Sequence, residues 1–147
     1  MQNMNWLSIL IASLIPMVIG FIYYHKNVFG NDWMTSLGMT PETMKKPNMG
    51  LVLGLSFVMA LMLSLFILYN VDGPSQEGPY DSFKHGAAHG LILAIMAAMP
   101  IMVTNGLFEQ KSFKNMLINI SYWTITLVLM GGVLDAMNHL VWPDFPQ

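Results

Sequence analysis

The sequence predicts an all-α integral membrane protein, a four-helix bundle formed by a single domain over residues 1–147. Four long apolar runs hold almost none of the charged side chains, and they cover about residues 5–24, 49–69, 83–108 and 116–141. A helix needs about 20 apolar residues, at about 1.5 Å rise each, to cross a hydrocarbon core of about 30 Å. A soluble domain of 147 residues has no core that could bury four such helices.

The composition agrees with this class and excludes several functions. Hydrophobic residues make up 54% of the chain and charged residues only 10%, whereas a soluble domain carries about 25% charged residues. The chain has no cysteine, so disulfides and cysteine nucleophiles are excluded. The net charge of −2 argues against nucleic acid as a partner. Membrane lipid is the partner that the apolar runs imply.

The lysines predict the orientation of the chain. Lys84 lies on one side of the predicted bundle, and the other five lysines fall in the first and third loops, at Lys26, Lys45, Lys46, Lys111 and Lys114. Because cytoplasmic loops are enriched in basic residues, we expect these two loops inside and both termini outside the cytoplasm. The first run is too long for the core of a signal peptide, so we expect a retained helix.

The first loop carries a possible short helix of its own. Thr40, Pro41 and Glu42 are typical of an N-cap, a first helical position and an acidic first turn, and Pro47 would end the helix. The alternative is a plain connector with a surface turn.

Small residues recur at four-residue spacing in three of the runs and predict close helix packing. The residues are Gly50 and Gly54, Gly86 and Gly90, and Gly132 with Ala136. The same pattern serves contacts within one chain and contacts between copies. Pro16 and Pro100 are expected to bend the first and third helices.

Polar residues inside the apolar runs gather at two levels. The outer polar cluster consists of His85, His89, Asp135 and His139. Each helix contributes two of these residues one turn apart, and the antiparallel helices bring all four to a similar height. Such a set is compatible with a divalent metal or a proton relay, but hydrogen bonding between helices is the simpler interpretation.

The inner polar cluster consists of Asn105, Glu109, Asn115, Asn119 and Tyr122. Glu109 ends a helix, where the helix dipole disfavours a negative charge. We therefore expect it to pair with Lys111, with Lys114 or with the free N–H groups of the next helix. The cluster would act as a latch that fixes the hairpin, or as the inner mouth of a solute path.

Several motifs of the chain resemble the family called domain of unknown function 1761. They are Tyr23-Tyr24 with Val28-Phe29-Gly30-Asn31, then Phe83-x-x-Gly86-x-x-His89-Gly90, Asn105-Gly106-Leu107-Phe108-Glu109, Leu117-Ile118-Asn119-x-x-Tyr122 and Met130-Gly131-Gly132. The resemblance covers nearly the whole chain. It implies a small four-helix membrane protein of bacteria without an established activity, and hence a location in the bacterial inner membrane.

The sequence favours a non-enzymatic protein that acts as a homo-oligomer or as an accessory subunit beside another membrane protein. The alternative is a small carrier or channel with a polar vestibule between the third and fourth helices. A membrane metalloenzyme is disfavoured, because histidine-box enzymes use about eight histidines and this chain has four. No catalytic residues, cofactor or metal are expected.

Overall fold

The protein is all-helical over the residues that the computed structural model describes, which are 4–40, 42–43, 47–71 and 82–138. The helices are α1 (Trp6–Tyr23), the π-helical turn η1 (Lys26–Gly30), α2 (Asn31–Ser36), α3 (Met49–Val71), α4 (Phe83–Leu93), the π-helical segment η2 (Ala94–Ala98), α5 (Met99–Phe108) and α6 (Phe113–Asn138). Because α4, η2 and α5 are continuous, four helices are long and apolar enough to cross a membrane: Trp6–Tyr23, Met49–Val71, Phe83–Phe108 and Phe113–Asn138. The predicted fold class is confirmed.

The four long helices begin where a short polar side chain caps their free N–H groups. Asn5 accepts from the backbone N–H groups of Leu7 and Ser8 at 3.1 and 3.3 Å. The equivalent caps of α3, α4 and α6 are Asn48, Ser82 and Ser112. These caps explain why the apolar periodicity starts where it does.

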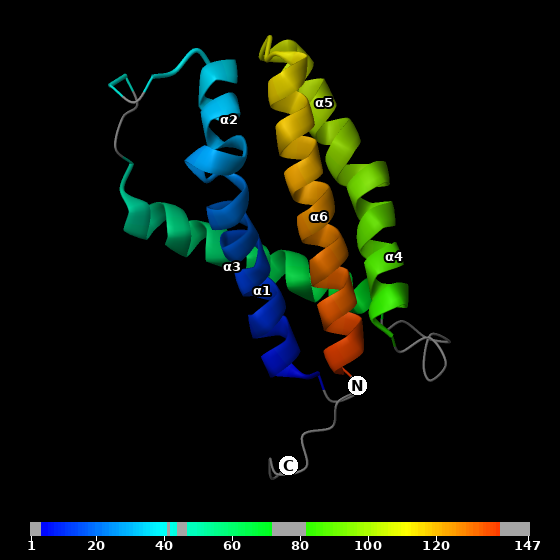
Figure 1. Cartoon of the computed structure of the whole chain (residues 1–147). Helices are drawn as coiled ribbons and strands as arrows, with labels where there is room; N and C mark the ends of the chain where they lie inside the picture. The colour runs from blue at the N-terminus through cyan, green and yellow to red at the C-terminus, as the bar shows by residue number, and fades with distance from the viewer. Residues whose placement is uncertain (1–3, 41, 44–46, 72–81, 139–147) are drawn as a thin grey trace.

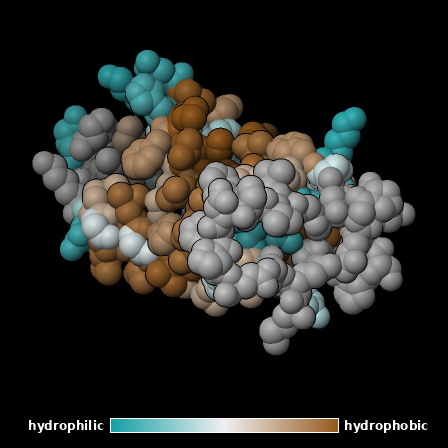
Figure 2. Space-filling view, turned by 90° about the horizontal axis from the view of Figure 1, so that it is seen from below, coloured by the Kyte–Doolittle hydropathy of each residue, from teal (hydrophilic) through white to brown (hydrophobic). Residues whose placement is uncertain are grey.

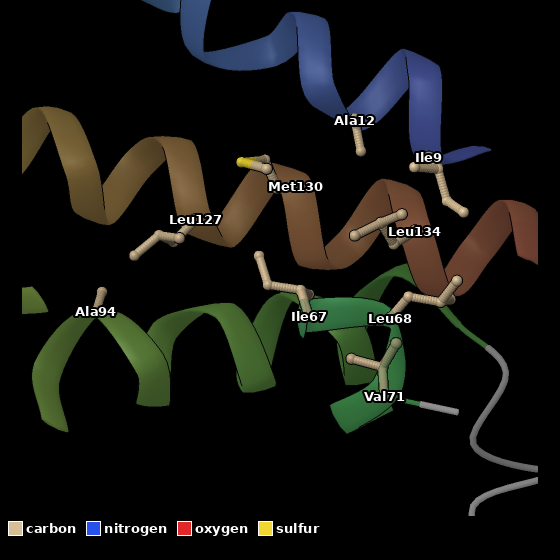
Figure 3. Packing of buried hydrophobic residues seen from close by; sticks show 9 residues of the cluster. All are labelled: Ile9, Ala12, Ile67, Leu68, Val71, Ala94, Leu127, Met130 and Leu134. Atoms are coloured by element: carbon tan, nitrogen blue, oxygen red, sulfur yellow. The ribbon is translucent and has the colours of Figure 1, made fainter. Parts of the chain in front are cut away.

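Three of the four long helices lie side by side, and α3 crosses behind α1 and α6 (Figure 1). The start of α1 meets the end of α6, where the Asn5 amide donates to the Met137 carbonyl at 2.8 Å. The core lies where α3 crosses the other helices (Figure 3), and it consists of Ile9, Ala12, Ile67, Leu68, Val71, Ala94, Leu127, Met130 and Leu134.

A polar contact inside this core joins α1 to α3. The hydroxyl of Ser13 donates to the Ile9 carbonyl at 2.7 Å and lies 3.0 Å from the hydroxyl of Ser64. Ser64 therefore donates to Ser13, and both residues are fully buried. A hydroxyl pair in an apolar core fixes how far the two helices are displaced along each other, because a shifted pair would lose its hydrogen bond.

The outer surface of the helices is largely apolar, as a lipid-facing surface requires. Hydrophobic side chains cover broad parts of the described surface when it is viewed from the end where α1 begins (Figure 2). The first half of α3 is the most exposed example, and its accessible side chains include Leu51, Leu55, Val58 and Met59. The buried residues of α3 start only at Ala60.

The glycines of α4 bring its backbone into contact with α6. A Cβ atom built on Gly86 would lie closer to the Gly131 carbonyl than any van der Waals contact, and one on Gly90 would meet the Leu127 carbonyl in the same way. Gly132 leaves room for the ring of Phe83. Close packing at the predicted Gly86, Gly90 and Gly132 is therefore present in the structure.

The other predicted packing pair behaves differently. A Cβ atom on Gly54 would have nothing within 4 Å, and one on Gly50 would meet only the side chain of Asn48 at 3.4 Å. Within one chain these two glycines therefore do not serve helix packing. The physical reason is that they lie in the half of α3 that no other described helix covers.

The expected bend at Pro100 takes the form of the π-helical segment η2. Proline lacks an N–H group and clashes with the carbonyl four residues before it, here that of Met96. The N–H of Met99 donates to the Ala94 carbonyl five residues back, which widens the turn just before the proline. Wider turns rotate each residue through a smaller angle, so η2 also changes which face of α5 meets α6.

The first loop does not form the expected helix at Thr40 in its described part. The N–H of Thr43 donates to the Thr40 carbonyl at 3.1 Å, which makes a turn. Pro41 and residues 44–46 lie outside the described residues. A single helical turn fixes many backbone angles for few hydrogen bonds. A cap therefore adds too little stability to keep such a short segment helical.

We predict that Gly90→Ala destabilises the protein, whereas Gly54→Ala leaves it almost unchanged. The new methyl group at position 90 meets backbone, which cannot move aside, and overpacking of this kind costs about 1–3 kcal/mol. Unfolding of both variants in mixed detergent micelles measures the difference. An equal loss in the two variants would contradict the close contact between α4 and α6.

Candidate functional site

The inner polar cluster lines a cavity of about 150 Å³ between α5 and α6. Four of its five predicted members line this cavity, together with a lysine and apolar side chains: Asn105, Glu109, Asn115 and Asn119, then Lys111, Met102, Gly106 and Met116. The amide of Asn115 is fully buried, whereas Asn105 and Glu109 are exposed at the rim. Both helices therefore contribute side chains to one polar cavity.

Glu109 has the basic partner that its position at a helix end requires. Its carboxylate lies 2.5 Å from the ammonium group of Lys111. The other candidate, Lys114, instead binds Asp32 of α2 at 2.7 Å. The cavity therefore carries one ion pair at its rim and no net charge from that pair.

A chain of hydrogen bonds runs from the end of α1 past the cavity to α2. The Tyr24 hydroxyl donates to the Asn119 carbonyl oxygen at 2.8 Å, and the Asn119 amide donates to Asn115 at 3.0 Å. The Asn115 amide then donates to the Ser36 hydroxyl at 3.0 Å, and Ser36 donates to the Trp33 carbonyl at 2.6 Å. Each bond fixes the donor role of the next, so the two asparagines are held in single orientations.

Tyr122 does not line this cavity, although the sequence placed it in the same cluster. Its hydroxyl donates to the Pro16 carbonyl of α1 at 2.8 Å, and its ring lies 5.1 Å from that of Tyr24. Tyr122 therefore belongs to the aromatic contact between α1 and α6. Its ring packs against Tyr24, which in turn binds Asn119 at the cavity.

The outer polar cluster forms a second chain, between α6 and α4. Nδ1 of His85 lies 3.0 Å from Oδ2 of Asp135, and the same oxygen accepts from the Ser82 N–H at 3.3 Å. Nε2 of His85 lies 3.2 Å from Nε2 of His89. Asp135 is only 1% exposed. His139, the fourth predicted member, lies outside the described residues.

The described members of the outer polar cluster are joined by hydrogen bonds. Within the described ranges, no three His, Cys, Asp or Glu side chains form a group that could hold a metal ion. The two imidazoles instead face each other through their Nε2 atoms, and Asp135 holds the far nitrogen of His85. A carboxylate in this position fixes both the tautomer and the orientation of an imidazole.

A second cavity, of about 190 Å³, opens between α3 and the continuous helix α4–η2. We call it the α3–α4 crevice, and its lining is Phe66, Ile67, Asn70, His89, Ile92, Leu93, Met96 and Ala97. It is mainly apolar, with His89 and Asn70 as its polar members. Sequence reasoning missed it, because the crossing angle of α3 decides which of its residues approach His89.

Sequence reasoning also missed the partners that the first loop supplies to the inner polar cluster. Ser36 and Tyr24 complete the hydrogen bonds of Asn115 and Asn119, but no spacing rule connects them to residues about 80 or 95 positions away along the chain. The adjacent residues Tyr23 and Tyr24 are the only signal that the sequence offers here, and they do not indicate their partner.

The fold and its two polar clusters define an all-helical protein with four helices of membrane-spanning length. A comparison with family models identifies the particular group. Residues 7–135 match the family described as protein of unknown function (DUF1761), and the chain belongs to this family. The chain matches no curated protein and no solved structure.

We predict that Asn115→Leu lowers the free energy of unfolding by about 1–3 kcal/mol, because it leaves Ser36 and Asn119 without a buried partner. Lys114→Met serves as the comparison. Its ion pair with Asp32 is more than half exposed on both side chains, at 60% and 52%, so its removal costs at most about 1 kcal/mol. Detergent unfolding of both variants is the measurement, and a larger loss for Lys114→Met would refute the buried chain.

Proposed function

We propose that the protein is a non-enzymatic, multi-pass protein of the bacterial inner membrane that admits a small polar solute at the cavity of the inner polar cluster. The observation that carries this proposal is the cavity itself, in which amides from α5 and α6 and one ion pair surround about 150 Å³. Polar side chains buried within membrane-spanning helices are costly unless they serve structure or function. In a purely structural latch the polar side chains would fill the space between the helices, whereas the inner polar cluster leaves a cavity of about 150 Å³.

The lining indicates the chemistry of the solute. Asn105, Asn115 and Asn119 offer amide donors and acceptors, and the carboxylate of Glu109 is balanced by Lys111. A solute with a net charge would find no unpaired countercharge among the described residues that line this cavity. We therefore infer a small hydrogen-bonding solute that is uncharged or zwitterionic, such as a polyol, urea or an amino acid.

An apolar core separates this cavity from the outer polar cluster. Leu127, Met130 and Leu134 fill α6 between the two clusters and are almost completely buried. Passage would require these helices to part, so a carrier that opens one end at a time fits better than a permanent pore. The distribution of the lysines favours the cytoplasmic side for this cavity. Labelling of single-cysteine variants in the loops from either side of the membrane tests that orientation.

Uptake into liposomes tests the solute proposal. We expect saturable uptake of at least one of glycerol, urea and glycine, and we expect Glu109→Gln to reduce it by about tenfold, since a hydrogen bond to a charged group contributes about 1.5–3 kcal/mol.

Asp32→Asn is the matched control for this experiment, because Asp32 pairs with Lys114 away from the cavity and should leave uptake unchanged. Uptake no faster than in empty liposomes for all three solutes would refute a carrier. An equal effect of the two variants would show that the cavity is not the entry point.

A homo-oligomer is the second candidate, and a specific observation favours it. The first half of α3 has no described helix against it, and Gly54 lies open on that half. Small residues on an apolar helix let a second helix approach closely. A second copy, or a larger membrane protein to which this chain is an accessory subunit, would complete this surface.

Cross-linking of the purified protein in liposomes tests the homo-oligomer. We expect oxidation of a Gly54→Cys variant to give a disulfide-linked dimer, because the chain has no other cysteine. Phe21→Cys is the control on α1, where the side chain is 63% exposed but no glycine opens the surface. Monomers alone from both variants would leave no support for pairing through α3.

A further inference from the structure

Asn115 and Asn119 of the inner polar cluster are held by two residues that do not line the cavity, Ser36 of α2 and Tyr24. We infer that Ser36 sets the orientation of both amides, so that the cavity presents N–H donors and recognises a solute through an oxygen that accepts hydrogen bonds. This inference rests on the proposed solute cavity, and it adds the group of the solute that is bound and the residue that determines this preference.

The direction of the hydrogen-bond chain is fixed at its α2 end. The Ser36 hydroxyl lies 2.6 Å from the Trp33 carbonyl oxygen. A carbonyl only accepts, and two oxygens at this distance repel unless a hydrogen lies between them, so the Ser36 hydrogen is committed to Trp33. The Asn115 group that lies 3.0 Å from the Ser36 oxygen is then a donor, which is the NH₂ end of its amide. No titratable group takes part at this end, so the assignment does not depend on pH.

The same direction passes from Asn115 to Asn119. The oxygen of the Asn115 amide faces Asn119, whose NH₂ group donates to it at 3.0 Å. The Asn119 oxygen in turn faces α1, where the Tyr24 hydroxyl donates to it at 2.8 Å. A hydroxyl also accepts hydrogen bonds, so Tyr24 alone is compatible with the reversed chain. Ser36 is therefore the residue that excludes the reversed chain.

Each of the two held amides has one N–H that the chain does not use. Each amide oxygen accepts one hydrogen bond and each NH₂ group donates one of its two hydrogens, with no further side-chain hydrogen bond to another described residue. Both residues line the cavity, and Asn115 is fully buried. A buried N–H without an acceptor is costly, whereas a carbonyl oxygen with one hydrogen bond is already satisfied. An oxygen of the solute supplies the missing acceptor.

The other polar groups of the cavity impose no such preference. Glu109 and Lys111 together offer an acceptor and a donor. Asn105 lies exposed at the rim, and its side chain makes no hydrogen bond within the described part of the chain, so its amide can turn to suit either group. The two held amides therefore decide the preference. Urea and amino acids offer a carbonyl or carboxylate oxygen without a hydrogen of its own, which suits N–H donors better than the hydroxyl groups of a polyol do.

Titration of the full chain with urea and with thiourea tests the inference. The two probes have the same N–H groups and nearly the same shape, but sulfur accepts hydrogen bonds more weakly than oxygen. The protein is labelled with ¹⁵N-asparagine and embedded in phosphatidylcholine nanodiscs, and binding is followed by the side-chain resonance of Asn119. We expect urea to bind about fivefold more tightly than thiourea, and Ser36→Ala to reduce this ratio to less than about twofold, because the chain is then free to reverse.

Two variants separate the control of orientation from a general loss of structure. Ser36→Thr keeps the hydroxyl and should retain the preference for urea. Tyr24→Phe removes the hydroxyl at the other end of the same chain, and it should also retain the preference, since Tyr24 does not set the direction. Equal preference in the wild-type protein and Ser36→Ala, or an equal loss of preference in Ser36→Ala and Tyr24→Phe, would overturn the inference.

The orientation of Asn115 is measured in the same samples without a solute. We expect nuclear Overhauser contacts between the side-chain NH₂ protons of Asn115 and the β-protons of Ser36, because the NH₂ end faces Ser36. Absence of these contacts would overturn the inference even if a solute binds. Their presence without saturable binding of urea, glycine or glycerol would instead refute the proposed solute cavity, and the inference with it. The two failures are therefore distinguishable.

Discussion

The contact of backbone against backbone between α4 and α6 is the constraint on which the rest of this structure depends. Where Gly86 and Gly90 meet Gly131 and Leu127, no side chain separates the two helices. Each histidine of α4 directly precedes one of these glycines, and successive residues of a helix differ by about 100° in direction. His85 and His89 are therefore held beside the contact, and Asp135 comes within reach of His85. Dispersion forces and a buried hydrogen bond thus act on the same few residues.

The π-helical segment extends this contact to the other end of the hairpin. In an uninterrupted α-helix, Gly106 would point about 160° away from Gly90, given the residues that separate them and about 100° for each. Both glycines nevertheless face α6, since Gly106 packs against the side chain of Met116. The wider turns of η2 reduce the rotation between them. The constraint that Pro100 places on the backbone therefore helps to bring Asn105 and Glu109 to the cavity.

The apolar runs were sufficient to predict four helices of membrane-spanning length, because a bilayer imposes length and hydrophobicity on each helix separately. Packing was only partly predictable. Gly50 and Gly86 carry the same spacing signal, yet only the second meets another helix. The difference depends on the crossing of α3, which no pattern within a helix encodes. For the same reason the sequence indicated the cavity residues on α5 and α6 but not Ser36. It also grouped Tyr122 with the cavity residues, whereas the Tyr122 hydroxyl binds the Pro16 carbonyl of α1.

The attachment of α3 has a mechanical consequence. Its buried residues all lie between Ala60 and Val71, and the hydroxyl pair of Ser13 and Ser64 fixes its position against α1 within that stretch. A helix secured over one half behaves as a lever. We expect a force on the free half to turn α3 about the Ser13–Ser64 contact, and the α3–α4 crevice lies on the secured half beside that contact. The packing around the free half of α3 would thereby be coupled to the width of this crevice.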